Sequence, residues 1–383
     1  ADERGTVDFD ELAHLAACAA GALAARGVRR GDRVGIALPD GRDWCAAFLG
    51  ATGLGAVAVP LPADGDPDQV AAALADCAAC AVVADGDPLG VPAIGAEGLA
   101  SGTPVAPRPV EPGDLAYLVY SSGSTGRPKA AMHAHADLRV GIETYAAQVL
   151  GLGPGDRCHS AARLHTSLGF GNGFFRVLGR GATAVLHGGP TGPRTTLEVV
   201  AGHRVTVLTG VPTFWAQLAG YGARRPDELA ALSTLRAAVS SGDGLSAAVA
   251  DTVRAALGIE LIQGLGCSEC SNIVISARPG ERADGSLGTP VPGIDVELRD
   301  PEGVPVPDGT PGRLWIRSES NTTGYWSRPD LSRDLVHGEW IRMGDVLERR
   351  GGRLHHLGRA DAMFKVDGRW VSPPQVEDAL MAH

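Results

Sequence analysis

Apolar positions near the start of the chain follow a helical period and then give way to short apolar runs. Between Leu12 and Leu23 the apolar residues fall on one helical face, and Gly27 lies where a C-terminal glycine would end the helix. The residues that follow predict strand, helix, strand, helix and strand, in that order, at 33–38, 43–52, 56–61, 68–78 and 81–84. Such alternation predicts an α/β fold in which helices cover the faces of a sheet.

A proline-rich connector at 101–112 leads into a second alternating region at 153–280. This region has strand candidates at 182–186, 205–209, 237–241 and 259–263. Beyond Gly288 the pattern changes to short strands separated by Gly and Pro, at 296–298 and 313–317. We therefore expect two βα sheet subdomains followed by a smaller β-rich subdomain.

Composition narrows the class of protein. At 383 residues and 39.3 kDa the chain exceeds one ordinary core. A net charge of −10 disfavours nucleic acid or an anionic membrane as the main partner. The uncharged run at 44–63 could span a bilayer by count, but its glycines and prolines favour a helix, a turn and a buried strand. No signal peptide opens the chain, so we expect a cytoplasmic enzyme without a membrane partner.

Lysine is rare, since Lys129 and Lys365 are the only two among 34 basic residues. A lysine kept in so arginine-rich a chain suggests a need for a compact ammonium. Lys129 closes the run 120–129, Tyr-Ser-Ser-Gly-Ser-Thr-Gly-Arg-Pro-Lys, whose glycines, hydroxyls and backbone N–H groups suit phosphates. It is not a Walker A loop, because Arg127 and Pro128 intervene and Ala130 follows the lysine. Taken alone, the run could also be a surface linker.

This loop resembles the phosphate-binding signature of the adenylate-forming superfamily of acyl-CoA synthetases, firefly luciferases and peptide-synthetase adenylation domains. Four further segments are similar, in the family's order, at 240–245, 263–269, 343–345 and 358–368. Two residues depart from the usual pattern: Asp243 stands where Glu is more common, and Ser268 stands where Thr is. The chain is most similar to benzoate and other aryl-CoA ligases. The resemblance implies a large N-terminal domain at 1–357, with 358–383 as hinge and truncated start of a mostly absent small domain.

The resemblance also implies roles for single residues. Lys129, Thr125 and Glu269 would be catalytic, with Glu269 and Thr125 holding Mg²⁺, while Asp361 would belong to the hinge. Taken alone, Glu269 could be a surface acid, Asp345 a turn residue and Arg359 half of a surface salt bridge. The residues implied in ATP binding are Ser121, Ser122, Gly123, Ser124, Thr125, Gly126, Lys129, Ser241, Gly242, Asp243, Gly266, Cys267, Ser268, Asp345 and Arg359.

The implied chemistry is attack of a carboxylate on the α-phosphorus of ATP, which releases pyrophosphate and leaves an acyl-adenylate. Both partners are anions, so Mg²⁺ and fixed donors must offset the charge. The acyl group would then pass to a thiol, either that of CoA or the phosphopantetheine of an acyl carrier protein. Two alternatives remain open: an adenylation domain of a polyketide or peptide assembly line, and a nucleotide-binding domain without catalysis.

The acid is expected to bind between the stretch 164–175 and residues 264–273, a region that resembles the aryl-CoA ligases. The first stretch has no acidic residue to pair with an α-ammonium, which argues against an amino-acid substrate. Leu168 and Asn272 replace the Tyr and His common in benzoate ligases, which predicts a wider pocket that is polar at one point. We therefore expect a substituted aromatic acid bearing an amino or hydroxyl group. The pocket candidates are His165, Thr166, Ser167, Leu168, Gly264, Gly266, Asn272 and Ile273.

Two Cys-x-x-Cys pairs, Cys77 with Cys80 and Cys267 with Cys270, form a possible four-thiolate zinc pattern. The first pair adjoins an apolar run, and the second overlaps a segment that resembles an ATP motif. Reduced thiols without zinc are therefore the favoured interpretation.

Overall fold

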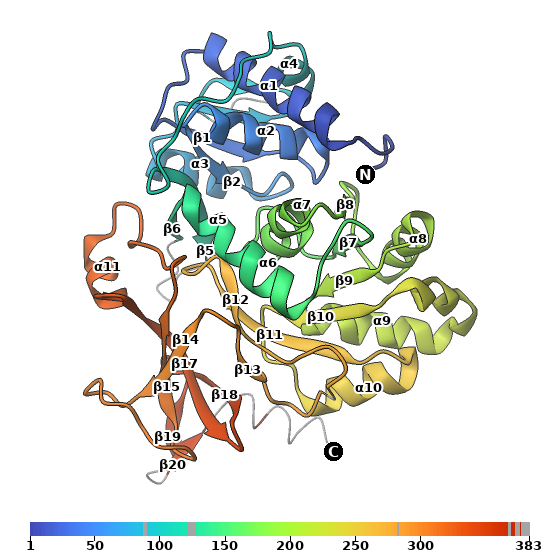
Figure 1. Ribbon diagram of the computed structural model, residues 1–383, viewed down its shortest axis with the longest axis vertical. Coiled ribbons are helices and arrows are strands. Elements are labelled where there is room, and N and C mark those ends of the chain that lie inside the picture. Colours follow the sequence, from blue (N-terminus) through green and yellow to red (C-terminus); the bar gives the residue numbers. More distant parts are fainter. Residues whose placement is uncertain (87–89, 122–127, 282, 367–368, 372–375, 377–383) are drawn as a thin grey trace.

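The computed structural model describes residues 1–383 except 87–89, 122–127, 282, 367–368, 372–375 and 377–383. Two large sheets, each covered by helices, lie side by side, and a smaller β-rich unit adjoins both (Figure 1). The first sheet is at the top of that view, the second at the right and the β-rich unit at the lower left. This arrangement confirms the predicted fold class.

The first sheet has the strand order β4-β3-β1-β2-β5-β6. All neighbours are parallel except β5 and β6, which pair antiparallel at the edge. Helix α1 begins where Asp8 accepts a hydrogen bond from the Glu11 N–H, and it ends just before Gly27, whose φ is +86°. The uncharged run at 44–63 forms most of α2 and all of β2, as expected. The elements are β1 Arg33–Ala37, β2 Val57–Pro60, β3 Ala81–Ala84, β4 Ala93–Ile94, β5 Leu115–Ser121, β6 Lys129–Ala134, α1 Phe9–Ala25, α2 Arg42–Gly53, α3 Pro67–Asp76 and α4 Ala96–Ala100.

The second sheet has the order β13-β12-β11-β10-β9-β7-β8, in which the first two pairings are antiparallel and the others parallel. Strand β11 extends four residues beyond its predicted end, so the glycines of the 263–269 segment lie on a strand rather than in a loop. The strands are β7 Arg157–Ser160, β8 Thr183–Val185, β9 Val207–Gly210, β10 Ala237–Ser241, β11 Leu261–Cys267, β12 Asn272–Ser276 and β13 Thr289–Pro290.

The helices of this region include two π-helical segments, each continuing an α-helical turn. No helix in the described part of the chain is long and apolar enough to cross a membrane. The helices are α5 His135–Gly141, η1 Ile142–Val149, α6 Ser167–Gly169, η2 Phe170–Phe175, α7 Arg176–Gly179, α8 Pro193–His203, α9 Pro212–Arg224, η3 Pro226–Thr234 and α10 Ala247–Leu257.

The β-rich unit begins after β13 and is built from antiparallel strands, as the short predicted strands indicated. Strand β18 runs through the boundary that the sequence placed between residues 357 and 358, so the division into two domains stays a prediction. The elements are β14 Asp295–Arg299, β15 Gly312–Arg317, α11 Pro329–Leu335, β16 Val336–His337, β17 Trp340–Arg350 and β18 Arg353–Arg359, and a separate pair, β19 Phe364–Val366 with β20 Arg369–Val371, follows.

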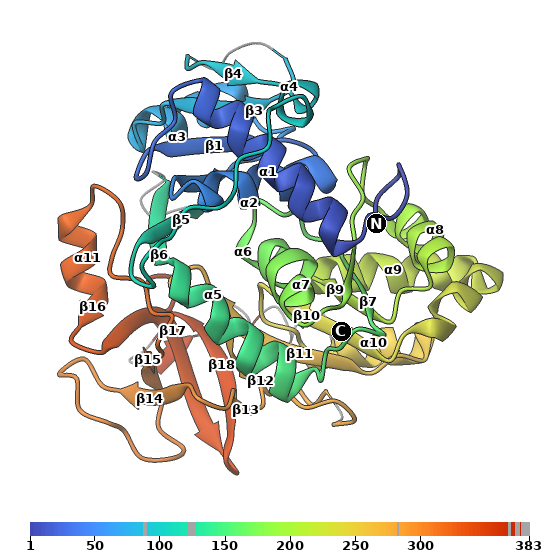
Figure 2. The same cartoon turned by 45° about the horizontal axis from the view of Figure 1, so that its top comes forward.

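One aromatic cluster joins the first two sheets. Trp44 and Phe48 of α2 contact Phe170 and Phe174 of η2, with ring centroids 5.0–6.2 Å apart. Tyr117 of β5 packs against Phe170 at 5.1 Å, and all five side chains are at most 1% exposed. Such rings dominate the energy of a core, so the relative placement of the two sheets rests largely on this contact. Figure 2 shows α2 and α6 facing one another at this junction.

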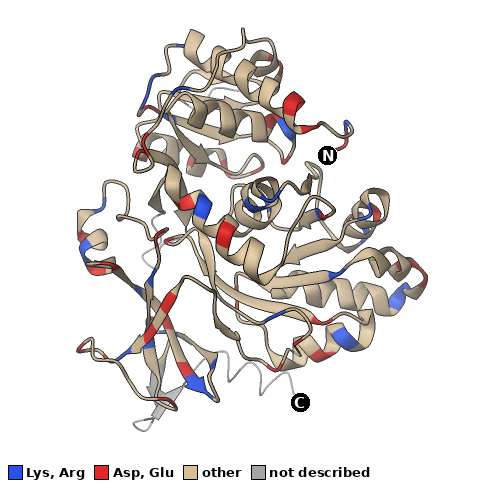
Figure 3. Cartoon of the chain, in the orientation of Figure 1, with Lys and Arg blue, Asp and Glu red and all other residues tan. Residues whose placement is uncertain are grey.

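Charged residues are dispersed over the outside of the molecule. Figure 3 shows acidic and basic positions interspersed, mostly on helices and turns, while the strands of the two large sheets are largely uncharged.

The contact between the second sheet and the β-rich unit generates a stability prediction. Leu287 N–H donates to Leu354 and Leu354 N–H donates back to Gly288, at 2.7 and 2.9 Å. Gly288 has φ +88°, and a Cβ there would lie 2.3 Å from the Ser276 carbonyl oxygen. Gly288→Ala should therefore cost about 3–5 kcal/mol of unfolding free energy in urea titrations.

Gly303→Ala is the matched control, because Gly303 has φ +85° and nothing within 4 Å of the added Cβ. It should cost only the backbone strain of about 1–2 kcal/mol. Equal losses in the two variants would show that the close approach of Gly288 to Ser276 is unimportant.

Candidate active site

Lys129 and Glu269 meet although they lie 140 residues apart in the chain. Lys129 is the first residue of β6, and Glu269 follows the carboxyl end of β11. The lysine Nζ donates to Glu269 Oε1 at 3.2 Å, and the glutamate is only 7% exposed. Two of the predicted catalytic residues thus form an ion pair where the first and second sheets meet. The third, Thr125, lies outside the described residues.

Tyr325 completes this contact, although no sequence pattern predicted a role for it. Its hydroxyl accepts a hydrogen bond from Lys129 Nζ and donates one to Glu269 Oε1, both at 2.5 Å. Burial, followed by the charge of Glu269, raises the pKa of Tyr325 far above its usual range, so the phenol keeps its proton. Tyr325 reaches the site because Met132 and Trp326 make backbone hydrogen bonds between β6 and its own segment. The only local signal is two adjacent aromatic residues, 325 and 326, after a glycine.

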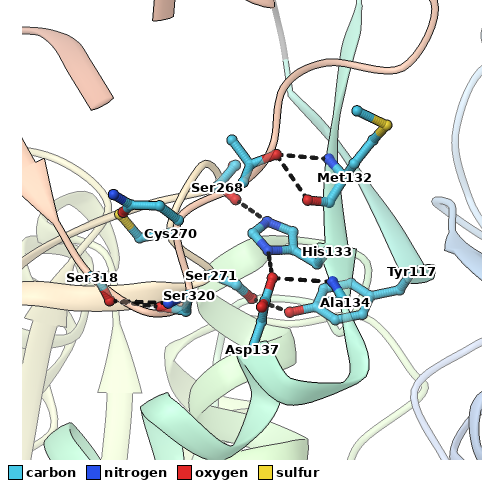
Figure 4. A network of polar contacts seen from close by, with 12 residues as sticks. Tyr117, Met132, His133, Ala134, Asp137, Ser268, Cys270, Ser271, Ser318 and Ser320 are labelled. Carbon is cyan, nitrogen blue, oxygen red and sulfur yellow. Dashed lines mark hydrogen bonds and ion pairs between the residues drawn. The ribbon is translucent and has the colours of Figure 1, made fainter. Parts of the chain in front are cut away.

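A network of buried polar groups holds the turn that carries Glu269 (Figure 4). His133 of β6 stacks on Tyr117 and donates from Nε2 to the Ser268 carbonyl at 2.7 Å. Its Nδ1 lies 2.9 Å from Asp137, whose carboxylate also accepts from the Ala134 N–H. The two ring nitrogens of His133 thus face oxygen atoms of two different segments. The turn is thereby attached to the first sheet.

The same turn is attached at its other end. The Tyr117 hydroxyl donates to Ser271 Oγ at 2.7 Å, and the Thr322 N–H donates to the Glu269 carbonyl at 2.7 Å. Cys270 Sγ donates to Asn321 at 3.1 Å. The position of the Glu269 carboxylate is therefore determined by contacts from three separate parts of the chain.

The Glu269 carboxylate suits a magnesium ion that arrives with a nucleotide. In the described part of the chain both of its hydrogen bonds go to Oε1, which leaves Oε2 for a cation. No group of three or more His, Cys, Asp or Glu among the described residues could hold a metal by itself. Mg²⁺ commonly uses one or two carboxylates and completes its coordination with phosphate oxygens and water. The residues present fit that mode.

The cysteines are distributed differently from a zinc site. Cys77 ends α3 beside the first sheet, whereas Cys267 ends β11 in the second. The neighbouring Cys270 thiol, and then burial, raise the pKa of Cys267 well above its usual value. Both features agree with the preferred interpretation of separate, protonated thiols.

The predicted ribose and adenine-side residues lie on the β-rich unit and at the end of β10 in the second sheet. Asp345 of β17 and Arg359 of β18 are register partners, and the Asp345 carboxylate accepts from His356 Nε2 at 3.0 Å. His356 also lies against Gly244, since a Cβ on that glycine would be 3.6 Å from its Nδ1. The contacts of His356 thus show that the predicted adenine-side segment and the predicted ribose segment are adjacent.

The remaining nucleotide candidates are less informative. Ser241 ends β10 and is buried, whereas Gly242, with φ +102°, and Asp243 are exposed just beyond it. Arg359 Nε donates to Asp361 at 3.2 Å. Ser121 is the last residue of β5, and Ser122, Gly123, Ser124, Thr125 and Gly126 lie outside the described residues.

The acid-binding candidates separate into two groups. Ser167 and Ser268 face each other with their hydroxyls 2.6 Å apart, and Leu168 lies near Gly242. Gly266 has no room for a side chain, because a Cβ there would lie 2.8 Å from Ile273; at Gly264 the corresponding distance is 3.0 Å. These residues bring the 164–175 stretch against β11 and β12.

The other acid-binding candidates are at least partly buried or form hydrogen bonds with neighbouring protein groups. Thr166 caps α6 by accepting from the Gly169 N–H, and burial lowers the pKa of His165, which favours the neutral ring. The amide of Asn272 is 3% exposed, donates to Thr144 and accepts from the Ile273 N–H. Asn272 as a contact for the acid stays a prediction, and its oxygen and one of its two N–H donors are already engaged.

Comparisons with known proteins agree with this geometry. Residues 1–326 match the family of AMP-binding enzymes. The chain is 34% identical to the benzoate–CoA ligase of Thauera aromatica over 100% of this chain and 77% of that protein. It is 33% identical to the anthranilate–CoA ligase of Pseudomonas aeruginosa over 94% of this chain and 72% of that protein.

Two solved structures that resemble this chain are also aryl-CoA ligases. The anthranilate CoA ligase AuaEII in complex with anthranoyl-AMP superposes with a TM-score of 0.92 at 31% identity, covering 100% of this chain and 79% of that one. A benzoate CoA ligase from Burkholderia xenovorans LB400 gives 0.89 at 31% identity, covering 100% and 80%. The chain therefore belongs to the AMP-binding, adenylate-forming enzyme family. The predicted resemblance is confirmed, and the chain is an acid–thiol ligase of the aryl-CoA ligase type.

Asp40 generates a pH prediction at the edge of this site. The carboxylate follows β1 and accepts from the N–H of Leu164, where the 164–175 stretch begins, at 3.1 and 3.3 Å. Burial raises the pKa of Asp40 to about 6, above the unfolded value of roughly 3.9. The folded state therefore holds a proton that the unfolded state releases, and stability falls as pH rises between about 4 and 6.

Asp40→Asn keeps an acceptor oxygen and removes this charge. Its unfolding free energy should rise relative to the parent protein by about 1–3 kcal/mol between pH 4 and pH 7, as measured by urea titration at several pH values. Asp156→Asn should instead lower the unfolding free energy relative to the parent protein. Burial raises the pKa of Asp156, but hydrogen bonds from Arg236, Gly153 and Thr206 outweigh it and leave that pKa lowered. A pH-independent difference for Asp40→Asn would contradict the assignment.

Proposed function

We propose that this chain activates an aromatic carboxylic acid with ATP, forms the acyl-adenylate with release of pyrophosphate, and passes the acyl group to the thiol of CoA. The observation that carries the proposal is the meeting of Lys129 and Glu269 beside the Ser167–Ser268 contact. The chain is similar over nearly its whole length to aryl-CoA ligases, and a cation and a carboxylate beside the proposed acid pocket support this function.

The reaction joins two anions, so charge must be offset where it develops. Lys129 supplies a fixed ammonium, and Tyr325 orients it by a hydrogen bond rather than by a second charge. Magnesium bound with ATP would be held by Glu269 Oε2 and would neutralise charge on the phosphates. Because these groups are already positioned by buried contacts, little reorganisation is needed during attack.

The nucleotide's ribose is proposed to bind Asp345, with Arg359 beside it. A carboxylate can accept from both ribose hydroxyls through its two oxygens. His356 already donates to Oδ1 and fixes the plane of the Asp345 carboxylate. Gly242 and Gly244 leave backbone exposed next to this point, as close approach of a base requires.

CoA is the preferred acceptor in this proposal because similar proteins across nearly the whole chain are named CoA ligases. A carrier protein as acceptor has no comparable support. Offering CoA and a phosphopantetheinylated carrier protein in parallel to the acyl-adenylate complex would decide between them.

Lys129→Ala should lower the rate of acid-dependent pyrophosphate exchange into ATP by on the order of 10²-fold, because one preorganised charge-stabilising donor is lost. The fold should persist, since β6 and its backbone pairing with β5 do not depend on the Lys129 side chain. Arg139→Ala is the control: Arg139 is an exposed cation on the adjoining helix α5 and should leave the exchange rate unchanged. Full exchange activity in Lys129→Ala would remove the lysine from the mechanism.

Asp345→Ala should weaken nucleotide binding by about 1.5–3 kcal/mol, the range for hydrogen bonds to a charged group. Calorimetric titration with ATP or AMP measures this directly. Asp308→Ala, at an exposed turn of the same β-rich unit, should bind both nucleotides normally. If Asp345→Ala keeps the parent affinity, the ribose binds elsewhere.

A further inference from the structure

Arg176, the first residue of α7, is a buried cation without a counter-ion. It is 2% exposed, and it forms no ion pair with any carboxylate in the described part of the chain. Two of its N–H groups donate to neutral oxygens, one to Asn172 Oδ1 at 2.6 Å and one to the Ser271 carbonyl at 2.9 Å. Its Nε is buried and has no partner among the described residues. Burial lowers the pKa of Arg176 to about 10, which still leaves it charged at neutral pH.

The surroundings of this guanidinium are shaped to hold it. A Cβ on Gly171 would lie 2.1 Å from Nη1, and a Cβ on Gly141 would lie 2.9 Å from Nε. The rings of Tyr145 and Phe175 contact the guanidinium, with centroids 5.7 and 5.0 Å from Cζ. Two glycines and two aromatic rings therefore surround the guanidinium closely. This arrangement suggests that the position of Arg176 is specifically supported.

A second polar group in the same place lacks a partner. The Tyr145 hydroxyl is fully buried and makes no hydrogen bond within the described residues. The nearby Ser276 hydroxyl donates instead to the carbonyls of Gln263 and Ala277. Leaving buried donors unmatched costs about 1–3 kcal/mol each, more for a charged group. The Arg176 Cζ lies 5.7 Å from the Tyr145 ring centroid, so two such groups occur in one region and point to a ligand that satisfies them.

The location fits the far end of the candidate acid pocket. Gly171 lies one helical turn after Ser167, and Ser271 lies two residues after Glu269. The carboxylate that reacts must lie near Lys129 and Glu269, so the rest of an aromatic acid extends away from them. Both Tyr145 and Gly171 belong to π-helical segments, which are frequent at functional sites.

We propose that Arg176 and Tyr145 form the polar end of the acid pocket and select an aromatic acid that carries an oxygen substituent on the ring. The inference rests on the proposed function and names its substrate class. A guanidinium only donates hydrogen bonds, so it pairs with the oxygen of a hydroxyl group and is poorly matched to the N–H groups of an aromatic amine. Arg176 and Tyr145 are thus specificity-determining residues.

The test compares kcat/KM for benzoate, 3- and 4-hydroxybenzoate and 3- and 4-aminobenzoate by acid-dependent pyrophosphate exchange with the full-length enzyme. The parent enzyme should prefer one hydroxybenzoate over the aminobenzoate of the same position by at least about 10-fold. Arg176→Met should abolish that preference. Tyr145→Phe should reduce it at least about 3-fold without changing the melting temperature.

The Tyr145→Phe variant separates this proposal from a structural role. A hydroxyl without a partner adds nothing to packing, so a purely structural tyrosine would tolerate Phe with every acid. Arg180→Met is the matched control, one turn further along and partly exposed, and should keep the parent ranking of acids. Equal loss with all acids in Arg176→Met, or an unchanged ranking in Tyr145→Phe, would overturn the proposal.

The outcome for benzoate distinguishes a failure of the selectivity proposal from a failure of the proposed function. If benzoate is turned over but hydroxy and amino acids are equivalent in the parent enzyme, the selectivity proposal fails and the proposed function stands. If none of these acids supports exchange, the proposed function itself fails, and the selectivity proposal fails with it.

Discussion

The attachment of the 268–271 turn to the first sheet is the constraint on which the site depends. His133 donates to the Ser268 carbonyl, and Tyr117 donates to the Ser271 hydroxyl, from two strands of a different sheet. Both donors are fully buried, so releasing either one would leave an unpaired polar group in the core. The turn therefore has one favourable position, and Glu269 projects from it toward Lys129.

This attachment also explains how a loop from the first sheet can act with a carboxylate from the second. The β5–β6 hairpin carries Lys129 at one end of β6 and His133 near the other, so one strand presents both the cation and the donor that holds the turn. Tyr325 then links Lys129 to Glu269 by two short hydrogen bonds. A displacement of the sheets would break all these contacts together, which favours a single arrangement of the charges that ATP must meet.

Selectivity follows from a different physical principle, the cost of unmatched buried donors. Arg176 is surrounded by glycines and rings that exclude water, and the only oxygens it contacts among the described residues are neutral. The site lacks an acceptor for a buried N–H of Arg176. An acid that supplies this acceptor therefore binds more favourably than acids that do not. The amide of Asn272, in contrast, has its needs met by Thr144 and its own backbone neighbour, and adds little reason to prefer one acid.

The sequence by itself determined the order of helices and strands, because alternating burial leaves a periodic trace that is readable locally. Lys129 was singled out by the rarity of lysine and by the glycine- and serine-rich run that it closes, whereas Glu269 and Asp345 were indicated by the resemblance of their segments to the adenylate-forming family. Tertiary structure decided which of these residues meet. Tyr325, His133 and Arg176 have no distinctive spacing, and their roles arise from partners 95 to 196 residues away. A side chain's hydrogen-bond partner is a property of the packed fold, so local pattern could not indicate that the buried donors at 145 and 176 would lack acceptors.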